Sequence, residues 1–272
     1  GSVRILAAFN GLVGYKSSDG RIDKRGVFPL SDTLDSIGPI GRTVEDCILV
    51  ETHLRGAVTS TVRRAPLAGQ RFVMATNVVL DEIEADVATA LEAAVDDLAK
   101  AGAGIKSRPV PALDAVMRVT AEHGTLTAAE AYTVHKGLVD GPEAERIDRR
   151  VVSRILNGKR MSAADVLIIQ SERRRLMAEI AADLDGAVLV MPTTVHVAPP
   201  IAPLEADDAL FHSTNLRTLR NTMLGNFLDL CGLAIPSGRT PSGMLFNLPA
   251  GEDDRLLSLG LELDRVLLPR RL

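Results

Sequence analysis

The chain has 272 residues, of which 46% are hydrophobic and 24% charged, and its formal net charge at pH 7 is −4. These values are typical of a globular protein, and the mixing of acidic with basic residues argues against a polycationic surface for nucleic acid or membrane. No apolar run approaches the roughly 18 residues of a membrane-spanning helix. The two cysteines, Cys47 and Cys231, have neither disulfide-framework nor zinc-ligand spacing, so we expect core cysteines in a reducing, cytoplasmic protein.

Short apolar segments alternate with longer amphipathic ones, a pattern that predicts an α/β sheet covered by helices. In chain order, we expect strands at 12–15 and around Ile37, a helix from Thr43, a strand at 72–75, a helix over 82–100, a mostly helical region over 112–184, a strand at 187–191, a loop at 199–203, a helix over 214–231, strands at 233–235 and 244–246, and a last helix from Asp253. Nothing in the composition divides the chain, so we expect one domain over residues 1–272.

Local signals fix several of these boundaries. Thr43 can cap the helix that follows it, with Asp46 three residues on as the acidic partner of a capping box. Gly102 is well placed as a left-handed cap after the helix over 82–100. The fully apolar run over 187–191 predicts a buried strand. Breaks in the long helical region are expected at 141–142 and 157–158.

The strongest motif opens the chain: Gly1-Ser2-Val3-Arg4, followed by the runs over 7–16 and 20–29 and by Leu34-Asp35-Ser36-Ile37-Gly38-Pro39. Together these runs resemble the amidase signature family, whose nucleophile is the serine of a Gly-Gly-Ser-(Ile/Val)-Arg sequence. The resemblance implies a mixed β-sheet sandwiched by helices, with Ser2 as the catalytic nucleophile and no metal or organic cofactor. It also implies that Arg4 holds the nucleophile loop through hydrogen bonds, or, as a sharper alternative, that it binds an acidic substrate. At Leu6 the chain departs from the family, which nearly always has proline there.

The resemblance continues toward the C-terminus, over 190–194, 221–238 and 253–262. The chain matches the C-terminal half to two-thirds of a typical family member. The family's Gly-Leu-Pro-Val-Gly-Leu-Gln strand is replaced by a run that ends at Asn247, a difference shared with some small-amide and urea-derivative amidases. The tRNA-linked members of the family usually carry a Tyr-Asp-Gly motif, and this chain has none.

Several parts of the family's catalytic apparatus have no counterpart in the sequence. The family's base is a lysine relayed through a second serine, and both precede the nucleophile, as does the glycine-rich loop that donates to the oxyanion. Every lysine of this chain follows Ser2. We therefore expect a partial amidase domain without its N-terminal segment, with apolar faces left exposed and either that segment or a second copy in a homodimer as partner.

Other hydrolytic chemistries fit the sequence less well. It has no Gly-x-Ser-x-Gly elbow, no Ser-x-x-Lys, and no HExxH pairing among its five histidines. The function that the resemblance implies is hydrolysis of a carbon–nitrogen bond in a small amide, through an acyl-enzyme on Ser2. The alternative is a non-catalytic remnant, or a part that depends on a partner for the lysine and the second serine.

Overall fold

The computed structural model describes residues 1–239 and 241–268. Its centre is a seven-stranded sheet in the order β2-β1-β6-β7-β5-β3-β4. The strands are β1 (Val13–Lys16), β2 (Ile40–Gly41), β3 (Arg71–Ala75), β4 (Gly104–Arg108), β5 (Val188–Pro192), β6 (Cys231–Pro236) and β7 (Gly243–Leu248). β3 pairs in parallel with β4 and β5, whereas the other pairs are antiparallel. The sheet is therefore mixed, as expected.

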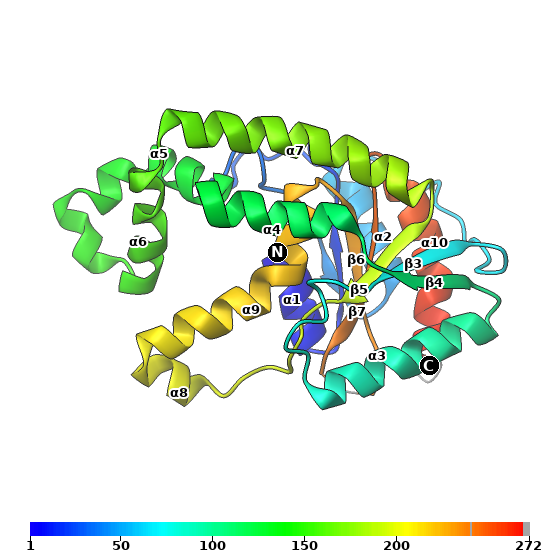
Figure 1. Ribbon diagram of the computed structural model, residues 1–272. Coiled ribbons are helices and arrows are strands. Elements are labelled where there is room, and N and C mark those ends of the chain that lie inside the picture. The colour runs from blue at the N-terminus through cyan, green and yellow to red at the C-terminus, as the bar shows by residue number, and fades with distance from the viewer. Residues whose placement is uncertain (240, 269–272) are drawn as a thin grey trace.

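Helices cover both faces of this sheet (Figure 1). They are α1 (Ser2–Phe9), α2 (Val44–Leu54), α3 (Ala85–Lys100), α4 (Pro111–His123), α5 (Leu126–Val139), α6 (Arg149–Leu156), α7 (Ala163–Leu184), α8 (Ile201–Ala206), α9 (Asp208–Phe227) and α10 (Asp253–Leu267), with the 3-10 helices η1 (Pro142–Arg146) and η2 (Gly158–Arg160). α2, α3 and α10 share one hydrophobic core with the sheet, and α4, α7 and α9 share the other. The prediction of a mixed sheet sandwiched by helices is confirmed.

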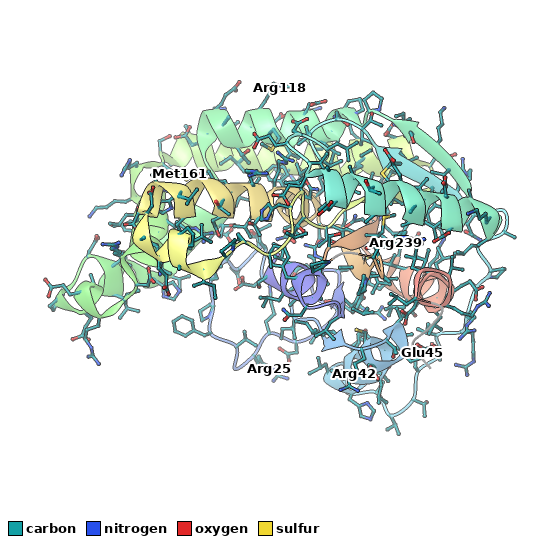
Figure 2. The ribbon with its side chains drawn as sticks, turned by 90° about the horizontal axis from the view of Figure 1, so that it is seen from below. Arg25, Arg42, Glu45, Arg118, Met161 and Arg239 are labelled. Atoms are coloured by element: carbon teal, nitrogen blue, oxygen red, sulfur yellow. The ribbon has the colours of Figure 1, made fainter. Side chains whose placement is uncertain are left out.

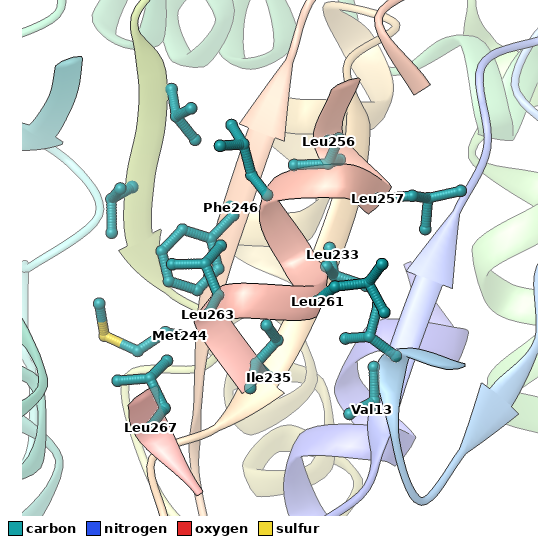
Figure 3. Close-up of a cluster of buried hydrophobic side chains, with 14 of the residues drawn as sticks. Val13, Leu233, Ile235, Met244, Phe246, Leu256, Leu257, Leu261, Leu263 and Leu267 are labelled. Carbon is teal, nitrogen blue, oxygen red and sulfur yellow. The ribbon is translucent and has the colours of Figure 1, made fainter. Parts of the chain in front are cut away.

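Strict alternation along the strands builds these two cores. On β6, Leu233 and Ile235 belong to the α10 side, whereas Ala234 between them belongs to the α9 side. On β7, Phe246 belongs to the α10 side and meets Phe72 of β3 edge to face, with ring centroids 6.3 Å apart. Figure 3 shows this packing, in which leucines of α10 lie against the aliphatic side chains of β6, β7 and β1.

α1 packs directly on β1, because the chain turns back after Phe9 and β1 then lies against α1. A Cβ on Gly14 would stand 2.7 Å from the Ala7 Cβ and 2.8 Å from the Val3 carbonyl oxygen, so only glycine allows this approach. α1 also contacts β6 and α9. The close packing on β1 fixes where the first residue of α1 lies.

Most of the predicted elements are present, and both predicted caps are confirmed. Thr43 and Asp46 form the expected capping box at α2, and Gly102 follows α3 with φ +89°. The helical region breaks at η1 and η2, as expected. Cys47 and Cys231 are buried and unpaired, and burial raises the pKa of both thiols to about 12, so they are core residues.

Several boundaries differ from the prediction. The strand placed around Ile37 is wrong: that segment is irregular, and the two-residue β2 begins at Ile40. α3 begins at Ala85, three residues late, because Glu82 has φ +54°, which a helix cannot contain. α9 begins at Asp208, since the Asp207 side chain accepts from two backbone N–H groups there and caps the helix.

Two elements were missed. The segment expected as a loop at 199–203 contains the start of α8, with Pro203 in its first turn, where proline tolerates a helix. β4 was not predicted, because its side chains are mostly exposed and polar at the edge of the sheet. Among the described residues, no helix combines the length and apolarity that crossing a membrane requires.

Several basic side chains pair with acidic neighbours close in the sequence. Arg25 pairs with Asp23, and Arg150 pairs with Asp148 in the same local manner. Arg25, Arg42 and Arg118 are all exposed and lie apart on the molecule (Figure 2).

Candidate active site

Ser2 lies at the first residue of α1 with its side chain exposed. A Cβ on the preceding Gly1 would stand 3.3 Å from the Thr222 Oγ1 and 3.6 Å from the Asn226 Nδ2, so this end of α1 meets the C-terminal half of α9 (Figure 1). Gly1 is the N-cap and brings no side chain to accept from the first-turn N–H groups. Those groups and the helix dipole favour negative charge at this end of α1.

Arg4, a buried residue of α1, links this helix to α9 by hydrogen bonds. Its side chain is fully buried, and Nη2 donates to the Thr222 carbonyl oxygen at 3.2 Å and to the Asn226 Oδ1 at 2.5 Å. Burial lowers the pKa of Arg4 to about 10, so the guanidinium stays protonated at neutral pH. These hydrogen bonds join α1 to α9, and the side chain exposes no surface to solvent.

Lys16 is a second buried cation on the same face of β1. Its Nζ donates to the carbonyl oxygens of Ser17 at 2.8 Å and Leu230 at 3.2 Å, and Asp229 lies 3.7 Å away. Burial, and then the Arg4 charge, lower the pKa of Lys16 to about 8, against an ordinary value of 10.5. Two buried positive charges, those of Arg4 and Lys16, therefore lie near α1, with Asp229 as the ion-pair partner of Lys16.

The Lys16 pKa predicts a rise of stability with pH. The folded chain binds this proton more weakly than the unfolded chain, so the charged form costs stability at low pH and that cost falls as pH rises from about 8 toward 10.5. From pH 7.5 to 9, we expect the unfolding free energy of the unchanged protein to rise by about 1 kcal/mol relative to that of Lys16→Met. Denaturant unfolding of both proteins at each pH measures this, because groups common to both cancel. A difference independent of pH would contradict the assignment.

Asp253 joins the segment after β1 to α10. Its carboxylate accepts from the Tyr15 hydroxyl, from the Ser18 N–H at 2.9 Å and from the Ser18 Oγ at 2.5 Å. Arg21 lies 3.9 Å from the same carboxylate and donates to Glu51 on α2 at 2.6 Å. Burial and then the neighbouring Asp253 raise the pKa of the Tyr15 hydroxyl well above its usual range. This buried network ties the 15–21 run to both α2 and α10.

α5 holds the loop that follows. Glu130 accepts from the Ser31 hydroxyl and from both the N–H and the hydroxyl of Thr33. Asp35 accepts from the Ser31 N–H at 3.0 Å within the loop itself. His135 contacts the Pro29 carbonyl oxygen at 2.7 Å. The 28–35 segment is therefore attached to a helix 100 residues away in the sequence, as the Glu130 contacts show.

Two of the C-terminal runs singled out in the sequence, 190–194 and 221–238, meet where α9 contacts the end of β5. Asn221 on α9 donates from Nδ2 to the Pro192 carbonyl oxygen at 2.8 Å and to the Val79 carbonyl oxygen at 3.1 Å, so α9 is fixed to the end of β5. Thr193 and Thr194, which follow β5, are fully buried. Sequence reasoning did not single out Thr222, Asn226 or Glu130 as contacts of the site. Thr222 and Asn226 lie within the resembling 221–238 run, which was the one signal that pointed toward them.

The structure does not supply Ser2 with a base. Among residues 1–239 and 241–268 its hydroxyl has no hydrogen-bond partner. Two surface hollows, of about 680 and 240 Å³, are lined by residues near Arg21 and near His123 respectively, and Ser2 lines neither. The described residues thus place and hold the serine, and they leave the group that would activate it unassigned.

Ser2 is thus exposed at the N-terminal end of a helix that packs on a mixed α/β sheet. The Amidase family model matches residues 1–257, and the chain belongs to this family. It is 29% identical to the 2-amino-5-chloromuconic acid deaminase of Comamonas testosteroni, over 98% of this chain and 59% of that protein. It is 27% identical to the indoleacetamide hydrolase of Agrobacterium vitis, over 98% of this chain and 61% of that one.

Solved structures give the same result. A crystal structure of an amidase superposes with a TM-score of 0.82 at 27% identity, over 98% of this chain and 61% of that one. The allophanate hydrolase of Kluyveromyces lactis, at 23% identity and a TM-score of 0.82, shares the fold. The chain thus spans about 60% of the length of the two named enzymes and of the amidase structure, and 45% of the allophanate hydrolase.

Proposed function

We propose that this chain is the nucleophile-bearing part of an amidase domain that hydrolyses the carbon–nitrogen bond of a small amide through an acyl-enzyme on Ser2. The observation that carries the proposal is the placement of Ser2: exposed, at the positive end of α1, on a helix that Arg4 fastens to α9. The family membership and the relatives named for hydrolysis or deamination support it.

In the proposed reaction, a base takes the proton from the Ser2 hydroxyl as its oxygen attacks the amide carbonyl carbon. The tetrahedral oxyanion that results develops beside the N-terminal end of α1, where the helix dipole favours negative charge. The carbon–nitrogen bond then breaks, and ammonia or an amine leaves with the proton that the base returns. Water attacks the acyl-enzyme, releases the carboxylic acid and restores the serine.

The base, in this proposal, belongs to polypeptide outside these residues. Ser2 has no hydrogen-bonded base among the described residues, and the chain spans about 60% of its relatives' length. Exposed apolar side chains also favour a covering partner: Leu6 on α1 is 53% exposed, Ile40 on β2 41% and Leu49 on α2 60%. A longer form of the same protein, rather than a homodimer, is the partner that this proposal favours.

Arg4 acts, in the same proposal, on the position of Ser2 rather than by touching substrate, because its side chain is fully buried. A small amide remains the proposed substrate, and the cytoplasm the proposed location, which the two unpaired cysteines support. A glutamyl-tRNA(Gln) amidotransferase of Mycobacterium ulcerans is also a relative, at 26% identity. The missing Tyr-Asp-Gly motif argues against that role here.

A fluorophosphonate probe, which reacts with activated serines, tests the assignment. We expect a longer form of the protein, in which upstream polypeptide supplies the base, to be modified at Ser2 faster than at Ser107, an exposed serine on β4, and the adduct to be located by peptide mass spectrometry. Ser2→Ala should abolish that adduct, whereas Ser107→Ala should leave it unchanged. Circular dichroism shows that each variant is folded. A folded longer form in which Ser2 reacts no faster than Ser107 would contradict the proposal and favour the non-catalytic alternative.

A further inference from the structure

Four buried polar atoms without a hydrogen-bond partner among the described residues belong to just two side chains, Arg4 and Asn247. They are the Arg4 Nε and Nη1 and the Asn247 Nδ2 and Oδ1. Both side chains are fully buried. Asn247 lies on β7, opposite Gly232 of β6 in the antiparallel register. The unpaired atoms therefore come from the helix and from the sheet beneath it.

Two glycines make the space in which these side chains meet. A Cβ on Gly232 would stand 2.7 Å from the Arg4 Nη1 and 2.9 Å from the Asn247 Oδ1. A Cβ on Gly225 of α9 would stand 3.2 and 3.3 Å from the same two atoms. The guanidinium and the amide thus share one slot between α9 and β6, closed on both sides by backbone.

The asparagine costs stability where it stands. A buried polar group without a partner costs about 1–3 kcal/mol, and its neighbours on the same face of β7 are Gly243 and Leu245, neither of which is polar. Leucine has the same number and branching of side-chain heavy atoms as asparagine and would continue the apolar face. A polar residue that the sheet does not need is a sign of a functional constraint.

The constraint follows from how Arg4 is held. α9 accepts only from Nη2, through Thr222 and Asn226, so the other edge of the guanidinium faces the sheet. There Asn247 provides the polar group. The amide lies in the same slot as this edge without a hydrogen bond to it, so it acts on the buried charge through its dipole and by filling the space beside it.

We propose that Asn247 is a positioning residue for Ser2: from β7 its amide faces the Arg4 guanidinium and keeps α1, with Ser2 at its first residue, in one orientation. The inference rests on the proposed role of Ser2 as the nucleophile. It assigns a function to the position at which this chain has asparagine at the end of its 241–247 run.

Two variants with the same number and branching of side-chain heavy atoms test the role. Asn247→Leu removes both unpaired atoms, so we expect an unfolding free energy equal to or above that of the unchanged protein. At the same time, hydrogen exchange of the α1 amides should become about tenfold faster, because the buried Arg4 charge loses the polar group beside it. The rate of fluorophosphonate modification at Ser2 should fall by a similar factor. Asn247→Asp keeps an acceptor beside Arg4 and should retain both the slow exchange and the reactivity.

Thr193→Val is the matched control. It removes another buried, unpartnered oxygen, near Ala8 at the opposite end of α1, and should leave both α1 exchange and Ser2 reactivity unchanged. The inference is overturned if Asn247→Leu changes neither readout, if Asn247→Asp behaves like Asn247→Leu, or if α1 exchange only follows a loss of global stability. If Ser2 is unreactive in the unchanged protein, the proposed function is contradicted. Hydrogen exchange of the α1 amides would still decide whether Asn247 positions the helix.

Discussion

Replacing Asp253 with alanine is expected to lower the free energy of unfolding by about 3–5 kcal/mol. The Asp253 side chain is 1% exposed and accepts from the Tyr15 hydroxyl and from both the N–H and the hydroxyl of Ser18. Alanine leaves these buried donors unpaired and removes the negative charge that lies beside Arg21. Denaturant unfolding followed by circular dichroism at pH 7 measures the change.

Asp254→Ala is the matched control, because it removes the same residue type from the next position of α10. Asp254 is 57% exposed and pairs with Arg21 at the surface, so its loss should cost at most about 1 kcal/mol. Equal losses from the two variants would show that burial and the Tyr15 and Ser18 contacts do not determine the role of Asp253.

Gly38→Ala is expected to be comparably damaging, for a steric reason. A Cβ on Gly38 would stand 1.8 Å from the Tyr15 carbonyl oxygen and 2.9 Å from the carbonyl carbon, so the collision is with backbone and no side chain can move aside. The loop has to leave β1, which removes the bond from the Tyr15 N–H to the Pro39 carbonyl oxygen at 3.0 Å. We expect a loss of about 3 kcal/mol or more in unfolding free energy, together with slower modification of Ser2.

The same change from glycine to alanine at Gly137 is expected to raise the unfolding free energy instead of lowering it. Gly137 lies inside α5, and nothing stands within 4 Å of its added Cβ. Alanine there should stabilise the chain by about 0.5–1 kcal/mol through helix propensity. Thermal unfolding of the two variants together separates a close backbone approach from the general cost of altering a glycine. A neutral Gly38→Ala would contradict the described packing of the loop on β1.

The elements that sequence patterns predicted correctly are those with a strong local signal. β5 is an uninterrupted apolar run, and the α2 cap needs only Thr43 and Asp46, which are three residues apart. β4 and α8 were missed because their signals are weak or contrary: β4 is polar at an edge and α8 contains Pro203. Pairing with β3 makes β4 a strand, and its own composition does not reveal this.

The candidate site was predictable in part. The resemblance of the first four residues pointed to Ser2 and Arg4, and the structure brings Arg4 against Thr222 and Asn226. Those partners could not be read from local patterns, since buried hydrogen bonds between distant segments leave no periodicity. Asn247 was noted in the sequence only as a departure from the family strand. Its position beneath Arg4 depends on the register of β6 with β7.

The contact between Arg4 and Asn226 joins residues 222 positions apart, and this separation sets an order of events during synthesis. At about 5–20 residues per second, the ribosome needs roughly 10–45 s after making Ser2 before α9 is available to hold it. α10, which brings Asp253 to Tyr15, comes later still. Ser2 is therefore translated well before the segments that fix its position. A nascent chain that stalls before α9 carries the serine without the support that would give it a defined orientation.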